Sequence, residues 1–319
     1  MAEQLLADPV LVTATPPPSS EGTSGGGRRR RAQRRAGALS LRVLVILYVA
    51  LLVAAPIGVL VWRTFATGIG EFLASISDPL AVHAFLVTAE VAGISVVLNT
   101  VLGMLAALLL TRHRFRGRRV LDALLGLPVS VSPIVVGLAL VLVYGSSGWF
   151  GPALDSLGLQ IILSLPGMVL ATMFVSIPLV TRAVAPVLEQ LGTEQEQAAR
   201  SLGANALTRF RRVTLPGIRF ALITGVVLAI ARCVGEYGAV LIVSGNVQGV
   251  TETATLRVSN LYQTLLDPNA AYAVTFVLVA VAIATIVVTS LLGRDRRDRH
   301  SPRLGGRGRE QHPEQEAIR

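Results

Sequence analysis

Two ionisable residues that stand four positions apart in an apolar stretch are the first candidates for chemistry. Arg232 and Glu236 belong to "ITGVVLAIARCVGEYGAVLIVSGN", where a helix places both on one face and lets them neutralise each other. An ionisable residue inside a membrane span is a candidate functional site by default. We expect either an ion pair that locks the span to a neighbour, with Glu90 in the same network, or a path for an anion in which Arg232 is the electropositive member.

The chain offers little else for catalysis. All 29 of its basic residues are arginine, so a phosphate-binding loop of the G-x-x-x-x-G-K-[ST] type and lysine Schiff-base chemistry are both excluded. The single cysteine, Cys233, lies in an apolar run, and the four histidines are scattered without metal-ligand spacing. We therefore predict no catalytic residue, no metal site and no bound cofactor, which makes an integral-membrane enzyme a disfavoured alternative.

The composition is that of a membrane protein. Hydrophobic residues make up 52% of the 319 residues and charged residues 15%, against about 25% charged in an average globular domain. Six apolar runs are long enough to cross about 30 Å of hydrocarbon as helices. These runs are Leu41–Trp62, Phe85–Leu110, Leu121–Tyr144, Ile161–Val180, Ile218–Val243 and Ala271–Leu292. We predict an all-α polytopic membrane protein with six transmembrane helices.

Proline placement distinguishes the third and fourth spans from the others. The third contains Pro128 and Pro133, and the fourth contains Pro166 and Pro178. Prolines are tolerated in membrane helices where neighbouring helices satisfy the freed carbonyl groups. We expect both spans to be kinked and packed inside the bundle.

Arginine placement predicts the orientation of the spans, because cytoplasmic loops carry the excess of basic residues. All of the 29 arginines except Arg63, Arg232 and Arg257 fall on one side of the membrane. Both termini are then cytoplasmic, and the net charge of +10 reflects topology rather than nucleic-acid binding. The expected order is a disordered basic leader (1–40), a membrane domain (41–292) with a cytoplasmic insert (181–217), and a basic tail (293–319).

The insert 181–217 is far longer than the few residues that a simple connection between two spans needs. It contains "EQEQAARSLGANALTRFRRVTLP", which is typical of an amphipathic helix. A first helix is predicted from about Pro186 to Leu202, with a possible break at Gly192. Gly203 ends this helix, because glycine accepts the left-handed conformation that a helix C-terminus commonly needs.

Thr193 and Glu196 fit a capping box that restarts the helix after the break. A second short helix, "ANALTRFRR", follows the turn, and Pro216 can start span five because its missing N–H is not needed there. Two short helices are thus joined by a turn at the membrane face. They are either a solvated connector lying on the lipid headgroups or a surface that docks a partner, and we favour the second.

The spacing in this insert resembles the cytoplasmic motif of ABC importer permeases, which is E-A-A, three residues, glycine, nine residues, then I-x-L-P. The matching positions, with the residue after the glycine included, are Gln197, Ala198, Ala199, Gly203, Ala204, Val213, Leu215 and Pro216. Gln197 replaces the usual glutamate, so Glu196 beside it is the alternative for the polar contact. The resemblance implies that the turn fits a groove on a separate ATP-hydrolysing subunit, in agreement with the missing lysine.

Further stretches resemble the oxyanion branch of these permeases, and the resemblance covers about residues 41–292. "GEYGAVLIVSG" is similar to the G-E-[FY]-G-A segment of that branch, and "GWFGPALDSLGLQ" and "LPGMVLATMFVSIPLV" look like W-type subunits of sulfate/thiosulfate importers. Where these have "SGHIRG", this chain has "SGNVQG", which leaves molybdate or tungstate as the alternative substrate. The implied pathway residues are Arg232, Gly235, Glu236, Tyr237 and Gly238.

The resemblance also implies the partners. These are an ABC ATPase subunit that uses ATP and Mg²⁺, a related T-type permease subunit or a second copy of this chain, a substrate-binding protein, and the lipid of a bacterial cytoplasmic membrane. A secondary transporter or channel is the remote alternative, because neither has a use for the cytoplasmic motif.

Overall fold

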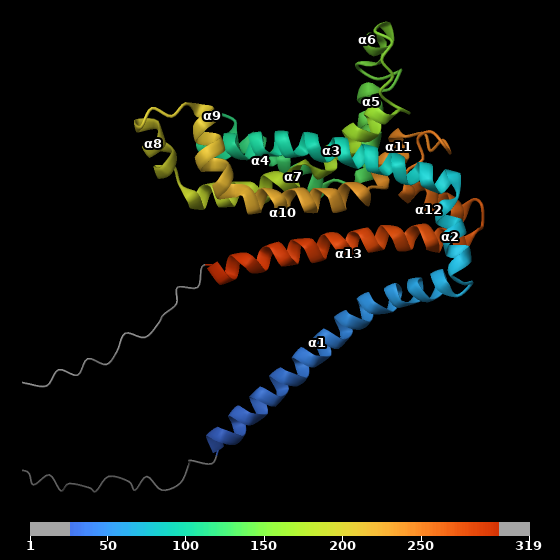
Figure 1. Cartoon of the computed structure of the whole chain (residues 1–319), viewed down its shortest axis with the longest axis horizontal. Helices are drawn as coiled ribbons and strands as arrows, with labels where there is room; N and C mark the ends of the chain where they lie inside the picture. Colours follow the sequence, from blue (N-terminus) through green and yellow to red (C-terminus); the bar gives the residue numbers. More distant parts are fainter. Residues whose placement is uncertain (1–25, 300–319) are drawn as a thin grey trace, which may run out of the picture. The chain divides into compact units, whose positions relative to one another are not determined.

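The structure is a computed structural model that describes residues 26–299, so the predicted leader before Gly26 and the predicted tail after Arg299 lie outside the described residues. Within that range every regular element is a helix (Figure 1), which confirms the predicted fold class. The elements are α1 (Gly26–Phe65), α2 (Ile69–Ser77), α3 (Pro79–Arg112), α4 (Arg118–Ser130), α5 (Pro133–Tyr144), α6 (Gly151–Ser156), α7 (Leu165–Leu191), α8 (Glu194–Ser201), α9 (Ala206–Arg209), a π-helical segment (Phe210–Thr214), α10 (Leu215–Val234), α11 (Gly238–Val243), α12 (Ala254–Gln263) and α13 (Pro268–Arg299).

Five helices in the described range are long and apolar enough to cross a membrane. They are Arg42–Phe65 in α1, α3, α7, the continuous stretch Ala206–Val234, and Pro268–Thr289 in α13. The remaining predicted span, the third, corresponds to α4 and α5, which pass the same test when they are taken together. The prediction of six spans agrees with the structure when this pair counts as one.

The third predicted span is broken rather than merely kinked. α4 and α5 are bent by 117° relative to each other. Val131 and Ser132 are extended, with ψ of 139° and 135°. Ser132 directly precedes Pro133, and the residue before a proline is pushed away from the helical conformation. Pro133 then begins α5, where its missing N–H has no partner to lose. As a result α5 and α6 project sideways from the long helices (Figure 1).

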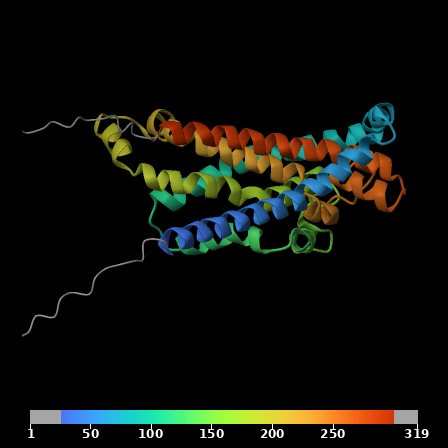
Figure 2. The same cartoon turned by 90° about the horizontal axis from the view of Figure 1, so that it is seen from below.

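The core forms where α3, α7 and α10 pack closely, and Figures 1 and 2 both show α7 beside α10. Gly103 of α3 is so near to α7 that an added Cβ would lie 2.9 Å from the Cβ of Val180. A Cβ added to Gly225 of α10 would likewise lie 3.1 Å from the Cα of Val180. Small residues allow membrane helices this close approach. The buried Asn99 side chain also donates to the Ser176 hydroxyl at 2.7 Å, which joins α3 to α7 through a polar contact.

The first helix of the insert is the continuation of span four. α7 runs without interruption to Leu191, so the prediction of a new helix at about Pro186 is wrong. Three fully buried residues, spaced by four, lie along the same face of α7: Val180, Val184 and Leu188. Continued packing of this face outweighs the one hydrogen bond that Pro186 removes. The predicted break at Gly192 is confirmed, with φ of 64°.

The first and last spans are longer than their apolar runs. α1 begins at Gly26, so residues 26–40, which we expected to be disordered, are helical. Extending an existing helix needs no new nucleus, and the arginine, alanine and glutamine of this segment are good helix formers. α13 likewise continues beyond Leu292 to Arg299. The polar ends of these helices therefore do not mark where helical structure stops.

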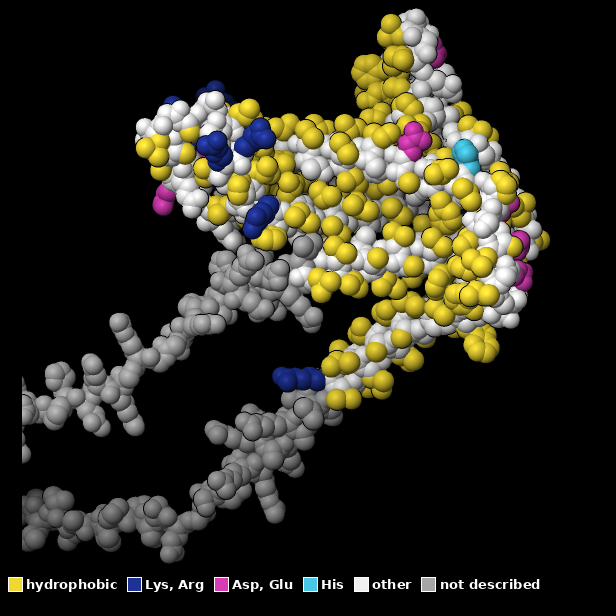
Figure 3. All heavy atoms as spheres, in the orientation of Figure 1, with side chains coloured by type: hydrophobic (Ala, Val, Ile, Leu, Met, Phe, Trp, Pro, Cys, Tyr) yellow, Lys and Arg dark blue, Asp and Glu magenta, His cyan; other side chains and the backbone are white. Residues whose placement is uncertain are grey.

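Side chains of different kinds gather at different places along the helices of residues 60–289 (Figure 3). Apolar side chains cover much of the visible flank, arginines gather at the end with α8 and α9, and acidic side chains lie at the opposite end near α2. Many large apolar residues are exposed on these flanks, including Val97, Leu105, Leu228 and Ile286. An apolar belt between polar ends is typical of helices surrounded by lipid.

Candidate functional site

The turn after α8 is built by a specific hydrogen-bond pattern. The Gly203 N–H donates to the Arg200 carbonyl at 3.0 Å, and the Ala204 N–H donates to the Ala199 carbonyl at 3.0 Å. These two bonds define a Schellman motif, in which the residue after the helix takes the left-handed conformation. Gly203 has φ of +83°, so the predicted turn at this glycine is confirmed. The Ala-Ala-x-x-x-Gly-Ala spacing thus has a local structural meaning.

Leu202 is 88% exposed at the tip of this turn, and the exposed Leu207 follows on α9. A leucine side chain left in water is unfavourable relative to one that is buried, so a partner that covered these residues would gain free energy. Sequence reasoning missed both residues, although a leucine directly before the turn glycine was a visible signal. Gln197 and Ala198 are exposed as well, whereas Ala199 is half-buried. The exposed residues form a small surface at the end of the bundle.

The second half of the motif lies in a membrane helix and outside the turn. Leu215 is half-buried against the core, and Pro216 is exposed in the first turn of α10. The helix is continuous from Ala206 to Val234, so span five does not start at Pro216 as predicted. In the π-helical segment the Leu215 N–H donates to the Phe210 carbonyl, one residue further back than in an α-helix. The backbone hydrogen bonds are thus rearranged directly before Pro216, which has no N–H to donate.

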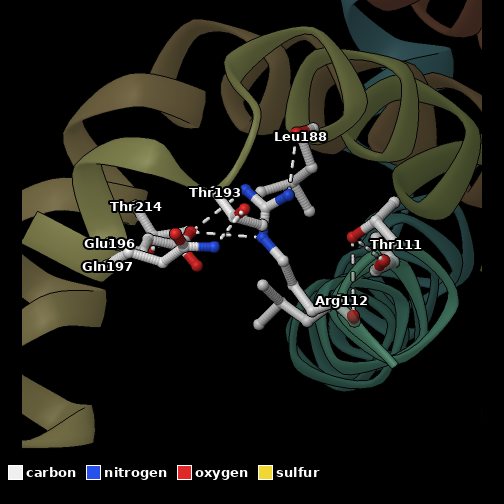
Figure 4. Close-up of polar contacts among 9 residues, drawn as sticks. Thr111, Arg112, Leu188, Thr193, Glu196, Gln197 and Thr214 are labelled. Atoms are coloured by element: carbon white, nitrogen blue, oxygen red, sulfur yellow. Dashed lines mark hydrogen bonds and ion pairs between the residues drawn. The ribbon is translucent and has the colours of Figure 1, made fainter. Parts of the chain in front are cut away.

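Glu196 points away from the exposed surface and into the chain (Figure 4). Its Oε1 accepts hydrogen bonds from Nη2 of Arg112 at 3.0 Å and from Oγ1 of Thr214 at 2.9 Å. The predicted capping box with Thr193 is therefore wrong, because the carboxylate is engaged elsewhere. The Thr193 hydroxyl instead accepts from Nε2 of Gln197 at 2.9 Å. Of the two candidates for a polar contact with a partner, the exposed one is Gln197.

The predicted ion pair in span five is present. Nη1 of Arg232 lies 2.6 Å from Oε2 of Glu236, and the Glu236 side chain is 2% exposed. Its Oε1 accepts from the Ala239 N–H at 2.9 Å. The pair lies where span five breaks, between the end of α10 at Val234 and the start of α11 at Gly238. The buried Glu236 carboxylate is stabilised by the Arg232 guanidinium and the hydrogen bond from Ala239 together.

Other groups hold the same break. The Thr255 hydroxyl of α12 donates to the Glu236 carbonyl at 2.8 Å, and the Tyr237 hydroxyl lies 3.2 Å from that of Ser259. Glu90, which we expected in this network, is exposed on α3 and takes part in no ion pair among the described residues. The break is thus tied to α12 instead of α3.

The breaks in spans three and five lie against each other, which sequence reasoning did not anticipate. A Cβ on Gly238 would lie 3.2 Å from the Cβ of Pro133, and one on Gly137 would lie 2.8 Å from the Ala239 carbonyl oxygen. Broken helices that meet within a membrane bundle commonly border substrate sites of transporters. Gly238 therefore lies where the two discontinuous spans meet, and Gly235 is in the same break of span five.

A second ionic group, buried at Arg257 and Glu252, joins α12 to the start of α3. Arg257 of α12 donates from Nη2 to Oδ2 of Asp78 at 3.2 Å, and its Nη1 lies 3.7 Å from Oε2 of Glu252. Asp78 also accepts from the Ala81 N–H and so caps α3. This group joins α3 to α12. Within the described residues no cluster of three or more His, Cys, Asp or Glu side chains is placed to hold a metal.

The family model of the binding-protein-dependent transport system inner membrane component matches residues 99–298, more than half of the chain. The chain belongs to this family. The matched residues include the turn at Gly203, the Arg232–Glu236 pair and the helix breaks in spans three and five. They exclude α1, α2 and the first part of α3.

Curated relatives of this inner membrane component are transport permeases. The sulfate transport system permease protein CysW of Synechocystis sp. PCC 6803 is 43% identical over 78% of this chain and 90% of its own length. Sulfate permease 2, chloroplastic, of Chlamydomonas reinhardtii is 45% identical over 75% of this chain but only 64% of its own length. A bacterial alginate ABC transporter, solved in complex with an alginate-bound periplasmic protein, shares the fold with a TM-score of 0.68 at 15% identity, over 85% of this chain and 98% of its own.

Proposed function

We propose that this chain is the permease subunit of an ATP-driven importer that moves sulfate or thiosulfate across the cytoplasmic membrane of a bacterium. The observation that carries the proposal is the exposed Schellman turn at Gly203, which lies at the arginine-rich end of a membrane bundle. The names of the sulfate permease relatives support the substrate. Molybdate or tungstate is the alternative substrate, since the segment after α11 lacks the expected histidine and arginine.

The proposed complex contains three further partners. An ABC ATPase subunit binds the turn and supplies ATP hydrolysis with Mg²⁺, because this chain has no lysine for a phosphate-binding loop. A related permease subunit or a second copy completes the pathway, and a substrate-binding protein delivers the anion outside. The distribution of arginine supports cytoplasmic termini. This orientation puts the turn on the ATPase side and the Arg257 group outside.

In the mechanism that we propose, the ATPase biases two states of the permease through the turn. A ligand shifts an equilibrium only by its differential affinity for the two states. Movement of α8 passes along the π-helical segment into α10, which ends at the Arg232–Glu236 pair. Arg232, whose side chain is about one-third exposed, is the group that can attract an oxyanion, while Glu236, Gly235, Tyr237 and Gly238 shape the break.

An uptake measurement tests the substrate. Proteoliposomes that contain the complete importer and its binding protein are expected to accumulate labelled sulfate, with excess thiosulfate competing. Molybdate is expected to compete weakly. Uptake of molybdate without sulfate would contradict the proposed substrate, and the alternative would replace it.

Replacing Gly203 with valine is expected to weaken copurification of the ATPase subunit by about tenfold. A side chain at φ of +83° strains the backbone by about 1 kcal/mol or more, and it also alters the shape of the exposed turn. The control is Gly158→Val, since Gly158 also has positive φ, at 66°, and open space around it, but lies far from the turn, beyond α6. If both variants retain the ATPase equally well, the turn is not the docking element.

A further inference from the structure

We propose that Arg112 is a positioning residue for ATPase coupling, because it fixes α8 to the cytoplasmic ends of α3 and α7. This inference rests on the proposed function. Figure 4 shows the Arg112 guanidinium between Glu196 and the Leu188 carbonyl. Nε and Nη2 donate to Oε1 of Glu196 at 3.2 and 3.0 Å, and Nη1 donates to the Leu188 carbonyl at 3.1 Å.

The position suits a guanidinium for two electrostatic reasons. Arg112 is in the last turn of α3, and Leu188 is in the last turn of α7, where carbonyl groups have no partner in their own helix and the helix dipole is negative. The N–H of Gly192 donates to Glu189, so the Leu188 carbonyl is left for Arg112. A planar group with five donors in fixed directions can hold this carbonyl and a carboxylate in a defined geometry, whereas a lysine ammonium is a point charge on a flexible stem.

α8 needs this contact because its own side chains do not hold it in place. No residue of α8 is buried, so the helix has no apolar anchor in the bundle. Glu196 is its inward contact, and the same carboxylate oxygen accepts from Thr214 in the π-helical segment. The side chains of Arg112 and Glu196 are only 13% and 21% exposed, so water competes little for the pair. Displacement of α8 is thus passed to α3 and α7 as well as to α10.

The test is the number of sulfate ions imported per ATP hydrolysed, measured in proteoliposomes with the complete importer. Arg112→Ala is expected to leave ATPase binding and basal hydrolysis within about twofold of wild type and to lower uptake per ATP about tenfold, a usual size for coupling between sites. Arg112→Lys is expected to restore part of the ratio, because it keeps the charge but not the fork. Glu196→Ala is expected to match Arg112→Ala, and the double variant is expected to be no worse than either.

The matched control is the ion pair of Arg118 and Glu189, which joins α4 to α7 at 3.7 Å with side chains 46% and 60% exposed. Arg118→Ala and Glu189→Ala are expected to leave uptake per ATP unchanged. An unchanged ratio in Arg112→Ala and Glu196→Ala, or an equal loss in the control variants, overturns the role of Arg112. If the Arg112→Ala permease does not assemble with the ATPase, uptake per ATP in Glu196→Ala is the deciding measurement, because Glu196 is on α8, which has no buried residue. Wild-type protein that neither binds the ATPase nor takes up sulfate refutes the proposed function instead.

Discussion

Replacing Leu202 with aspartate is expected to weaken binding of the ATPase subunit about 30-fold. Leu202 is 88% exposed at the tip of the turn, so a partner that covers the turn must bury it. Loss of a buried anchor at the centre of an interface costs about 2 kcal/mol or more, and each 1.4 kcal/mol is about tenfold in affinity. A titration of the purified full-length permease in detergent with the ATPase subunit measures the change.

The same substitution is expected to leave the fold of the permease intact, because Leu202 buries almost nothing in the free chain. Thermal unfolding of the variant is expected at the wild-type temperature. Leu157→Asp is the control, since Leu157 is 70% exposed as well but follows α6, away from the turn. An affinity for the ATPase that is the same in both variants would show that the turn does not carry the interface.

Replacing Glu236 with glutamine is expected to destabilise the permease strongly and to abolish uptake. The substitution removes the negative charge that neutralises Arg232, at a position where the side chain of residue 236 is buried. Breaking a buried pair on one side costs about 3 kcal/mol, the lower end of the usual range, because Arg232 is about one-third exposed. The unfolding temperature in detergent measures the stability. Glu189→Gln, whose carboxylate is 60% exposed, is expected to leave it unchanged.

A double variant separates the two functions that the pair can have. Arg232→Met together with Glu236→Leu removes both charges, and apolar replacement of a buried pair is often neutral for stability. We expect the unfolding temperature to recover while uptake stays low, because no cation is left to attract an oxyanion. Recovery of uptake together with stability would mean that the pair only locks span five.

The sequence was sufficient to predict those features that depend on local chemistry. Apolar runs of about 20 residues predicted the spans, because backbone groups in lipid must be satisfied within a helix. Gly203 predicted the turn, since a left-handed residue is needed there whatever surrounds it. The Arg232–Glu236 contact followed from their spacing alone, although Glu236 lies just past the helix end.

The features that were missed depend on partners distant in sequence. Glu196 fits a capping box locally, but Arg112, 84 residues earlier, takes its carboxylate. Pro186 looks like a helix start, yet the buried face of α7 carries the helix through it. Pro133 predicted a kink, but the size of the bend, 117°, goes with the packing of Gly137 against α11, which the local sequence does not reveal. In each case a tertiary contact decided between two locally acceptable structures.

The close contact between Gly137 and the Ala239 carbonyl has a consequence for how α5 and α11 can move. With no space for even a methyl group, α5 and α11 cannot slide or rotate past each other. We therefore expect the two short helices to move together, with hinges at the non-helical residues that precede each of them. A change of access at this end of the bundle would then need one joint motion instead of two independent gates.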